Sequence, residues 1–244
     1  MKYFFIALQF LTIIPIKIKQ ELKPKDISKS LRFFPVIGLL IGLLLAGVCF
    51  VFNFLPPLVM SALIISVLVL ISGGLHLDGF ADSCDGLYGI RPKEERLKIM
   101  RASDVGAMGA IGIACLLILK FAVLASIPKD MLFKTLIIMP VFSRWTQVLA
   151  CYTSEYAREQ GKGMSFLTYN SKKEFIIASI FTLVLFVLIL KFKGIILFGL
   201  SCVPVFVFMF YIKKKIQGMT GDTVGAVNEF AEVSYVFNTL LLYC

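Results

Sequence analysis

Three aspartates in the first half of the chain have the residue type and the spacing of a metal site. Asp78, Asp82 and Asp85 follow an apolar run at intervals of four and three residues. On a helix these intervals place all three carboxylates on one face, where like charges repel one another. A bound cation would offset that repulsion, and Mg²⁺ is commonly held by one or two carboxylates together with substrate phosphates. The pattern therefore predicts a Mg²⁺ site, although a solvated acidic helix face would have the same spacing.

The same stretch is rich in glycine and contains the only histidine of the chain. Gly73 and Gly74 open it, at positions where glycine would cost a plain helix about 1 kcal/mol each relative to alanine. Glycine is useful where the backbone must approach a ligand closely, so we predict that this pair contributes to substrate binding. His76 stands at the mouth of the cluster, where it could be a catalytic group or a structural residue.

A second acidic cluster lies close to the end of the chain. Asp222, Glu229 and Glu232 are separated by seven and three residues, which again suits one helical face. The two glutamates fall inside an otherwise apolar segment, where ionisable groups are expensive and usually face a site or a cavity. The alternative is that this segment stays outside the membrane and its acids are solvated. The first interpretation makes both acidic clusters candidate Mg²⁺ ligands.

Basic residues suited to phosphate lie between the two acidic clusters. Arg158 sits near glycines, and Arg144 lies inside an apolar run, where a guanidinium needs a carboxylate or a substrate anion as its partner. The segment after Arg101, with Ser103 and Gly106, could start a helix whose positive end favours anions. No Walker loop or nucleophilic triad is present. Carboxylates for Mg²⁺, arginines for phosphate and glycines for close approach together indicate phosphoryl transfer, which relies on positioning and charge neutralisation.

The composition indicates that a lipid bilayer surrounds these elements. Hydrophobic residues make up 59% of the 244 residues and charged residues only 16%, and the mean hydropathy is +0.89. A soluble domain has about a quarter charged residues. Because backbone in lipid must satisfy its own hydrogen bonds, we predict an all-α, polytopic integral membrane helical bundle with about six or seven transmembrane helices, forming a single domain over residues 1–244. The predicted spans are 34–55, 57–73, 105–127, 132–151, 175–191, 194–212 and, more weakly, 224–243. The first apolar run, 3–16, is too short to span comfortably and could be an interfacial or a re-entrant helix.

Lysine and arginine concentrate in alternate connections between these predicted spans. The four rich connections are 17–32, 74–104, 152–174 and 213–223, and the intervening connections are poor in charge. The positive-inside rule places the four rich connections in the cytoplasm, together with nearly all of the acidic residues. The net charge of +10 is explained in this way without a nucleic-acid partner. The six cysteines are scattered, which supports neither a disulfide framework nor a zinc site.

The glycine-rich acidic stretch resembles a family signature. Residues 73–86 match the pattern Gly-Gly-Leu-His-Leu-Asp-Gly-x-Ala-Asp-x-x-Asp-Gly of the cobalamin (5′-phosphate) synthase family. Similar family motifs occur, in order along the chain, at 10–15, 34–39, 157–163 and 221–229. The chain departs from the family pattern at 101–104, where an acid and a base are displaced. In and just after that segment, we match only Ser103, Gly106 and Gly109 to positions of the family pattern.

The resemblance implies a reaction and a set of partners. The family uses Mg²⁺ to join adenosylcobinamide-GDP to α-ribazole or α-ribazole 5′-phosphate, which gives adenosylcobalamin or its 5′-phosphate and releases GMP in a last step of cobalamin biosynthesis. The resemblance also implies a protein integral to the prokaryotic cytoplasmic (inner) membrane, with its active site on the cytoplasmic side. A homo-oligomer is an open alternative.

The same resemblance suggests roles for individual residues. His76 would orient or deprotonate the attacking hydroxyl, and Arg144 and Arg158 would neutralise the charge of the diphosphate. Gly73, Gly74, Ser103 and Gly106 would contact substrate. The expected Mg²⁺ ligands are Asp78, Asp82, Asp85, Asp222 and Glu229, and the expected catalytic residues are His76, Asp82 and Arg158.

Two other functions are compatible with a membrane protein that carries acidic clusters. A CDP-alcohol-type phosphotransferase also uses Mg²⁺ and carboxylates, but its pattern needs an arginine after the alanine, where this chain has Asp82 after Ala81. An ion-coupled transporter could use Glu229 and Glu232 as coupling groups, but such proteins often have repeated halves, and no convincing internal repeat is visible here.

Overall fold

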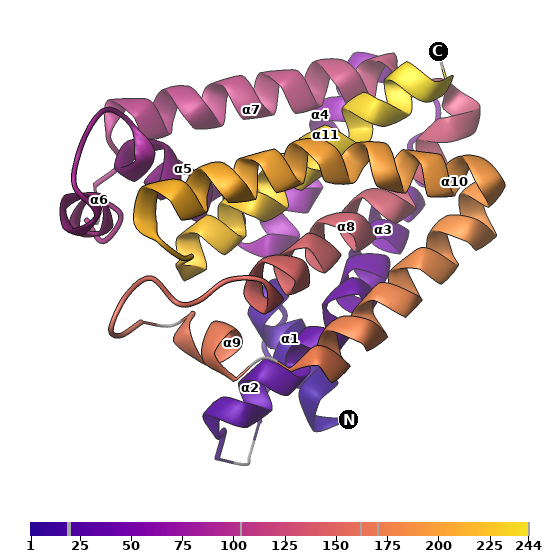
Figure 1. Cartoon of the computed structure of the whole chain (residues 1–244). Coiled ribbons are helices and arrows are strands. Elements are labelled where there is room, and N and C mark those ends of the chain that lie inside the picture. Colours follow the sequence, from indigo (N-terminus) through magenta and orange to yellow (C-terminus); the bar gives the residue numbers. More distant parts are fainter. Residues whose placement is uncertain (19–20, 103, 162, 170, 244) are drawn as a thin grey trace.

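The computed structural model describes residues 1–18, 21–102, 104–161, 163–169 and 171–243, and these residues form an all-helical protein (Figure 1). No strand is formed by any of them, and the prediction of an all-α fold is confirmed. The helices are α1 (Lys2–Leu11), α2 (Pro24–Ser30), the 3-10 turn η1 (Leu31–Phe33), α3 (Phe34–Val51), α4 (Pro57–Ser72), α5 (Leu75–Leu87), α6 (Lys93–Ile99), α7 (Ala107–Ser126), α8 (Lys129–Tyr152), α9 (Met164–Thr168), α10 (Lys172–Ile216) and α11 (Gly221–Tyr243).

Long apolar helices dominate this fold. Three helices within the described residues are long and apolar enough to cross a membrane: Pro24–Val51, Ala107–Ser126 and Lys172–Ile216. The bent pair α4 and α5 makes a fourth if it counts as one broken span. Many large apolar side chains on these helices point outward, among them Leu43 on α3, Ile118 on α7 and Val207 on α10. Apolar helices with such exposed faces suggest membrane association.

The count of six or seven spans remains a prediction. Local structure explains part of the difference between this count and the three or four long apolar helices. Helix α10 contains a break at Lys191, whose φ of 56° and ψ of −145° are not helical, and Figure 1 shows its two arms folding back on each other. The predicted runs 175–191 and 194–212 occupy these two arms. The run 3–16 forms only the ten-residue helix α1, which packs against α2.

Helices α8 and α11 form the centre of the bundle and carry many of its buried polar side chains. Helix α3 approaches α8 closely because Gly38 and Gly42 have no side chain: a Cβ at either position would lie 2.4 Å from a carbonyl oxygen of α8. Helix α11 packs against α5, α8, α10 and α7. Surrounding helices therefore separate α8 and α11 from the outside, which explains how these two helices can contain charged residues.

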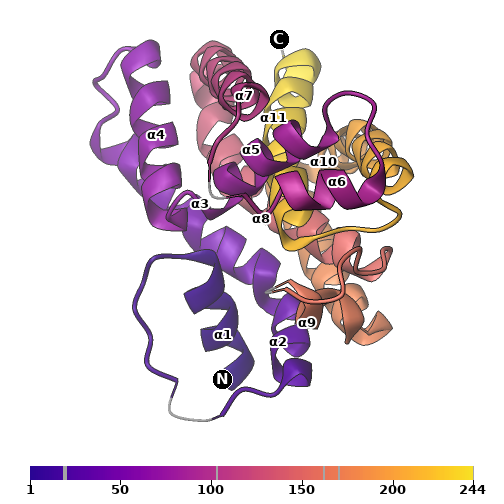
Figure 2. The same ribbon diagram turned by 90° about the vertical axis from the view of Figure 1, so that its left-hand side faces the viewer.

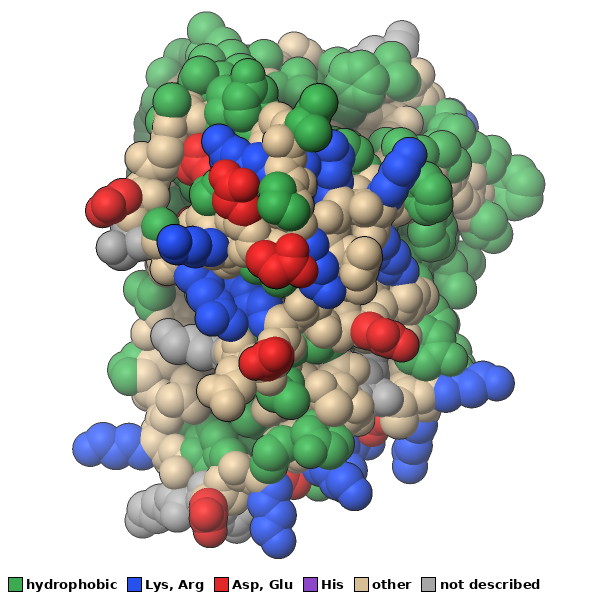
Figure 3. All heavy atoms as spheres, turned by 60° about the vertical axis from the view of Figure 1, so that its left-hand side comes forward, with side chains coloured by type: hydrophobic (Ala, Val, Ile, Leu, Met, Phe, Trp, Pro, Cys, Tyr) green, Lys and Arg blue, Asp and Glu red, His purple; other side chains and the backbone are tan. Residues whose placement is uncertain are grey.

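A sharp bend turns α5 across one end of the bundle. The axes of α4 and α5 meet at 92°. Gly73 and Gly74 form the bend with φ values of 62° and 68°, a left-handed conformation that glycine adopts without steric cost. Figure 2 shows α5 and α6 side by side at this end. Figure 3 shows that lysine, arginine and acidic side chains gather on the same face, which we call the charged end.

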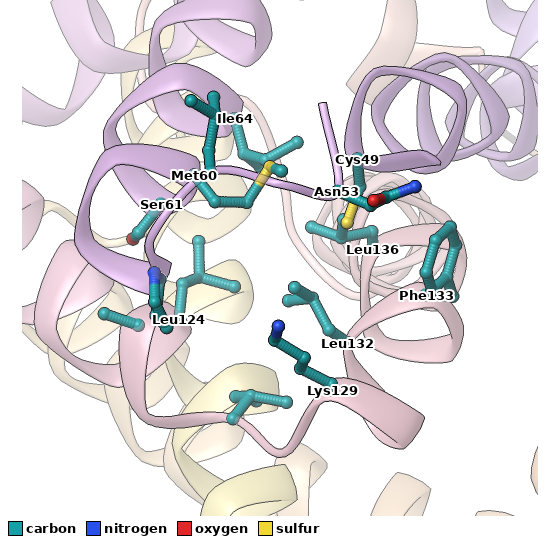
Figure 4. A pocket seen from close by; sticks show the side chains of 14 residues that line it. Cys49, Asn53, Met60, Ser61, Ile64, Leu124, Lys129, Leu132, Phe133 and Leu136 are labelled. Atoms are coloured by element: carbon teal, nitrogen blue, oxygen red, sulfur yellow. The ribbon is translucent and has the colours of Figure 1, made fainter. Parts of the chain in front are cut away.

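The other end of the bundle contains a small apolar pocket, shown in Figure 4. It lies between the α3–α4 connection and the α7–α8 connection, and its lining includes Met60, Leu124 and Leu136. Helix α7 runs from the charged end to this pocket, a distance of roughly 30 Å for its 20 residues. The few polar groups that line the pocket do not include a carboxylate.

Candidate active site

A cavity of about 220 Å³ opens at the charged end, between α1, α3, α5, α8, α9 and α11. One part of its lining is polar and another part is apolar. The polar lining consists of His76, Asp78, Gln147, Tyr156, Arg158 and Asp222. The apolar lining includes Phe10, Phe34, Phe166, Leu167 and Val224. The cavity thus brings together side chains from both acidic clusters and from the loop that contains Arg158.

Helices α5 and α11 cross at glycine, and this crossing joins the two acidic clusters. A Cβ on Gly79 would lie 2.6 Å from the Asp222 carbonyl oxygen, so only glycine permits this approach. Asp222 therefore lies opposite Asp78 and Asp82. Partial burial and, after it, the neighbouring carboxylates of Asp222 and Asp78 raise the pKa of Asp82 to about 7, although Arg158 opposes them. The electrostatics of this crossing favour a cation.

Backbone pairing places Arg158 beside Asp222. After α8 the chain runs back across the charged end, and Tyr156 forms an isolated parallel bridge with Met219. The Ala157 N–H donates to the Met219 carbonyl at 2.9 Å, which holds the next residue, Arg158, close to the start of α11. The Arg158 Nη2 atom lies 2.8 Å from Asp222 Oδ2, with the two side chains 10% and 28% exposed. This ion pair is accessible from the cavity.

His76 and Gln147 form a buried pair at the cavity wall. The Gln147 Nε2 atom lies 3.1 Å from His76 Nε2, and the two residues are 1% and 3% exposed, respectively. Burial, and after it the nearby charge of Arg144, lowers the pKa of His76, so its imidazole is neutral. A neutral imidazole in the cavity wall can accept or donate a hydrogen bond at a ring nitrogen.

Asp85 has a different role from the other aspartates of α5. Its carboxylate accepts hydrogen bonds from the backbone N–H groups of Gly106 and Gly109, with N···O distances of 2.8 Å each, and so caps the first turn of α7. A Cβ on either glycine would lie 2.4 Å from a carboxylate oxygen of Asp85. The structure thus gives Asp85 and Gly106 a role at the start of α7, and the sequence-based assignments of Asp85 to the metal and of Gly106 to substrate stay predictions.

Replacing Asp85 with alanine is therefore expected to affect stability. Loss of a helix cap costs about 1–2 kcal/mol, which should appear as a lower midpoint of thermal unfolding in detergent. Asp85→Asn retains one accepting oxygen at the same distance from the backbone and should recover part of the loss. An asparagine variant no more stable than the alanine variant would contradict the capping role.

A network of four buried charges lies deeper in the bundle, away from the cavity. Glu232 pairs with Arg144 and, at 2.7 Å, with Lys120, which also lies 2.7 Å from Glu229. The Ser143 hydroxyl and the Asn228 amide add hydrogen bonds to Glu232. Two positive and two negative groups balance in a region where an unpaired charge would be very costly.

This network contains two residues that the sequence assigned to the active site. Arg144 is 1% exposed and its partner is a carboxylate, so the structure does not bring it to the cavity as a diphosphate ligand. Glu229 faces Lys120 in the network, about two turns of α11 away from Asp222. Lys120 was missed by the sequence reasoning, although a single charge within the apolar run of α7 is a signal for a buried partner.

Three sequence-predicted residues remain: Gly73, Gly74 and Ser103. Gly73 and Gly74 form the α4–α5 bend and do not line the cavity, so we assign them to the turn. Ser103 lies outside the described residues. Gln147 was not predicted, because a glutamine within an apolar helix has no distinctive spacing.

A basic groove of about 420 Å³ adjoins the cavity on the other side of Arg158. It runs between α6 and the loop after α8. Lys93, Lys98, Arg101 and Arg158 line it together with two glutamates. Arg101 is held across the groove by a 3.1 Å hydrogen bond from its Nη2 atom to the Gln160 carbonyl. Arginine and lysine at this density suit a phosphorylated ligand.

The carboxylates at the cavity suit a Mg²⁺ ion whose remaining ligands come from a phosphorylated substrate. Among the described residues, no three His, Cys, Asp or Glu side chains are close enough to enclose a metal ion. Mg²⁺ is usually bound by only one or two carboxylates, with water and phosphate completing its shell. Asp78 and Asp82, with Asp222 opposite, provide hard oxygen ligands whose mutual repulsion a cation would relieve. These residues could hold Mg²⁺ when a phosphorylated ligand is present.

These features define a class of protein: an all-helical, membrane-type protein with carboxylates and an arginine around a cavity at one end. Comparison with known proteins makes the class specific. The family described as cobalamin-5-phosphate synthase matches residues 3–241. Relatives named adenosylcobinamide-GDP ribazoletransferase occur in Geotalea daltonii, 36% identical over 96% of this chain and 94% of the relative, and in Alkaliphilus oremlandii, 37% identical over 99% and 98%. Another, from Acetivibrio thermocellus, is 35% identical over 100% of this chain and 98% of the relative.

The chain belongs to the cobalamin-5-phosphate synthase family, whose members are transferase enzymes. The resemblance found in the sequence is thereby confirmed. No solved structure matches the chain.

Proposed function

We propose that this protein joins adenosylcobinamide-GDP to α-ribazole or α-ribazole 5′-phosphate in a Mg²⁺-dependent reaction. The ribose hydroxyl oxygen would form a bond to the cobinamide-linked phosphorus, the bond from that phosphorus to the oxygen shared with GMP would break, and GMP would leave with that oxygen. The names of the full-length relatives support this choice of substrates. The single observation that carries the proposal is the position of Asp78, Arg158 and Asp222 around one cavity.

Each side of the site has a task that its residues can perform. Arg158 lies between the cavity and the basic groove, so its guanidinium can bind the diphosphate while Lys98 and Arg101 bind further phosphate oxygens. The neutral imidazole of His76 can orient the attacking hydroxyl by accepting its hydrogen bond at a ring nitrogen, and Gln147 keeps the ring in place. Mg²⁺ held by Asp78 and Asp82, with Asp222, would neutralise charge on the phosphates.

The proposal includes a location in the prokaryotic cytoplasmic membrane, with six or seven spans and the charged end facing the cytoplasm. The basic residues of α6 and of the loop after α8 share the charged end with the cavity, as the positive-inside rule requires. The helices that carry outward-facing apolar residues extend away from this end. Water-soluble phosphorylated substrates could then reach the site without crossing the bilayer.

A direct assay tests this function. Detergent-purified protein is incubated with adenosylcobinamide-GDP, α-ribazole and Mg²⁺, and the corrinoid product and GMP are followed by chromatography. We expect both products in equal amounts, and none after chelation of Mg²⁺. If folded protein forms neither product with α-ribazole or with its 5′-phosphate, the proposed reaction is wrong.

A further inference from the structure

The apolar part of the cavity is built from three aromatic rings on three different helices. Phe10 of α1, Phe34 of α3 and Phe166 of α9 pack around one another. The ring centroid of Phe166 lies 4.7 Å from that of Phe10 and 5.6 Å from that of Phe34, and the centroids of Phe10 and Phe34 are 5.9 Å apart. Phe34 and Phe166 are almost completely buried, whereas Phe10 is 37% exposed. A flat apolar group entering the cavity would meet ring surfaces that are already held in place.

One polar group in the same cavity wall lacks a partner. Gln147 is 1% exposed, and its Oε1 atom accepts no hydrogen bond from any described residue. Its Nε2 atom is engaged with His76. A buried carbonyl oxygen without a donor is unfavourable, and a hydroxyl or N–H of a ligand would remove that cost.

We infer that this cavity binds the acceptor as a nucleoside, with a planar apolar base against Phe34 and Phe166 and a ribose hydroxyl donating to Gln147 Oε1. The inference rests on the proposed function. It adds the part of the site that binds the acceptor and the class of base that this part selects. The donor's nucleotide and diphosphate would occupy the basic groove on the other side of Arg158, where Lys98 and Arg101 lie.

The lining also predicts a preference between bases. Around the three phenylalanines the cavity offers Leu167 and Val224, which cannot form side-chain hydrogen bonds. A purine base would bury ring nitrogens and an exocyclic amine without partners there, whereas a benzimidazole presents fewer such groups. The site should therefore favour a benzimidazole riboside over an adenine riboside.

Phe166→Ala tests this inference. Loss of one stacking ring should raise the KM for a benzimidazole α-riboside about tenfold, with the KM for adenosylcobinamide-GDP unchanged. The ratio of kcat/KM for the benzimidazole riboside over that for the adenine riboside should fall. Equilibrium dialysis of the benzimidazole riboside, without the donor, should show the same weakening. Phe208→Ala is the matched control, because that ring stacks on Phe230 at 4.6 Å, outside the cavity.

The outcomes separate this inference from the proposed reaction. If the wild type forms product and Phe166→Ala retains its affinity for the riboside, the inference is wrong and the function stands. If the KM values for both substrates rise together, the cavity does not discriminate between them, and the inference is also wrong. Wild-type protein that binds the riboside without forming product would overturn only the reaction. Should the alanine variant not fold, Phe166→Leu keeps apolar volume without a flat ring and should weaken riboside binding in the same direction.

Discussion

Protein with Asp82 replaced by asparagine is expected to lose about a thousandfold in kcat while it folds as well as the wild type. The loss follows because asparagine keeps the shape but lacks the charge that would hold Mg²⁺ and so neutralise the phosphates. Stability should be unchanged or higher, because partial burial and repulsion by Asp222 and Asp78 disfavour the charged form of Asp82, as its raised pKa indicates. The measurements are the product-formation rate and the thermal unfolding midpoint in detergent.

Asp130→Asn is the matched control for this prediction. Asp130 is exposed at the start of α8, at the end of the bundle opposite the cavity, and removing its charge should leave activity unchanged. An Asp82→Asn protein with wild-type turnover would show that this carboxylate has no part in the reaction. A loss of activity accompanied by a lower unfolding midpoint would indicate a structural role instead.

Replacing Glu232 with methionine is expected to have the largest effect on stability. Glu232 is the shared partner of Lys120 and Arg144, and Arg144 has no other carboxylate partner among the ion pairs of the described residues. Leaving a buried guanidinium without its counterion costs about 3–5 kcal/mol. For a chain of this size that corresponds to a fall of about 10 °C in the thermal unfolding midpoint.

A double-mutant cycle separates the loss of an ion pair from the loss of packing. The double variant Arg144→Met/Glu232→Met removes both charges and leaves the Lys120–Glu229 pair, at 2.7 Å, in place. It should be more stable than Glu232→Met alone. If the effects of the two single changes simply add, Arg144 and Glu232 do not stabilise each other, and the description of a coupled network is wrong.

Local features of the fold were predictable because they depend on short stretches of sequence. The spacing of Asp78 and Asp82 places them one turn apart on a helix, and the structure forms that helix. The glycine pair before it indicated an unusual backbone, but not that its purpose is a 92° bend. Apolar runs predicted helices over most of the chain, and the predicted boundary between the runs 175–191 and 194–212 coincides with the non-helical φ and ψ angles at Lys191, between the two arms of α10.

Contacts between distant segments were not predictable from one sequence. Asp222 meets the α5 aspartates only because Gly79 lets two helices cross closely, and no spacing rule encodes that crossing. The partner of Arg144 was open between a carboxylate and a substrate anion, and the structure supplies Glu232. Asp85 has the same helical periodicity as its two neighbours, yet it caps α7, because Gly106 and Gly109 pack against it.

The most direct test of the central claim is metal-dependent activity of Asp78→Cys. Asp78 lines the cavity and is exposed to it, so a cysteine there could still bind a metal, but a thiolate favours soft ions over Mg²⁺. The account predicts that this variant forms no cobalamin product with Mg²⁺ and regains product formation with Cd²⁺. Wild-type rates with Mg²⁺ in the Asp78→Cys protein would contradict a metal-dependent active site at this cavity.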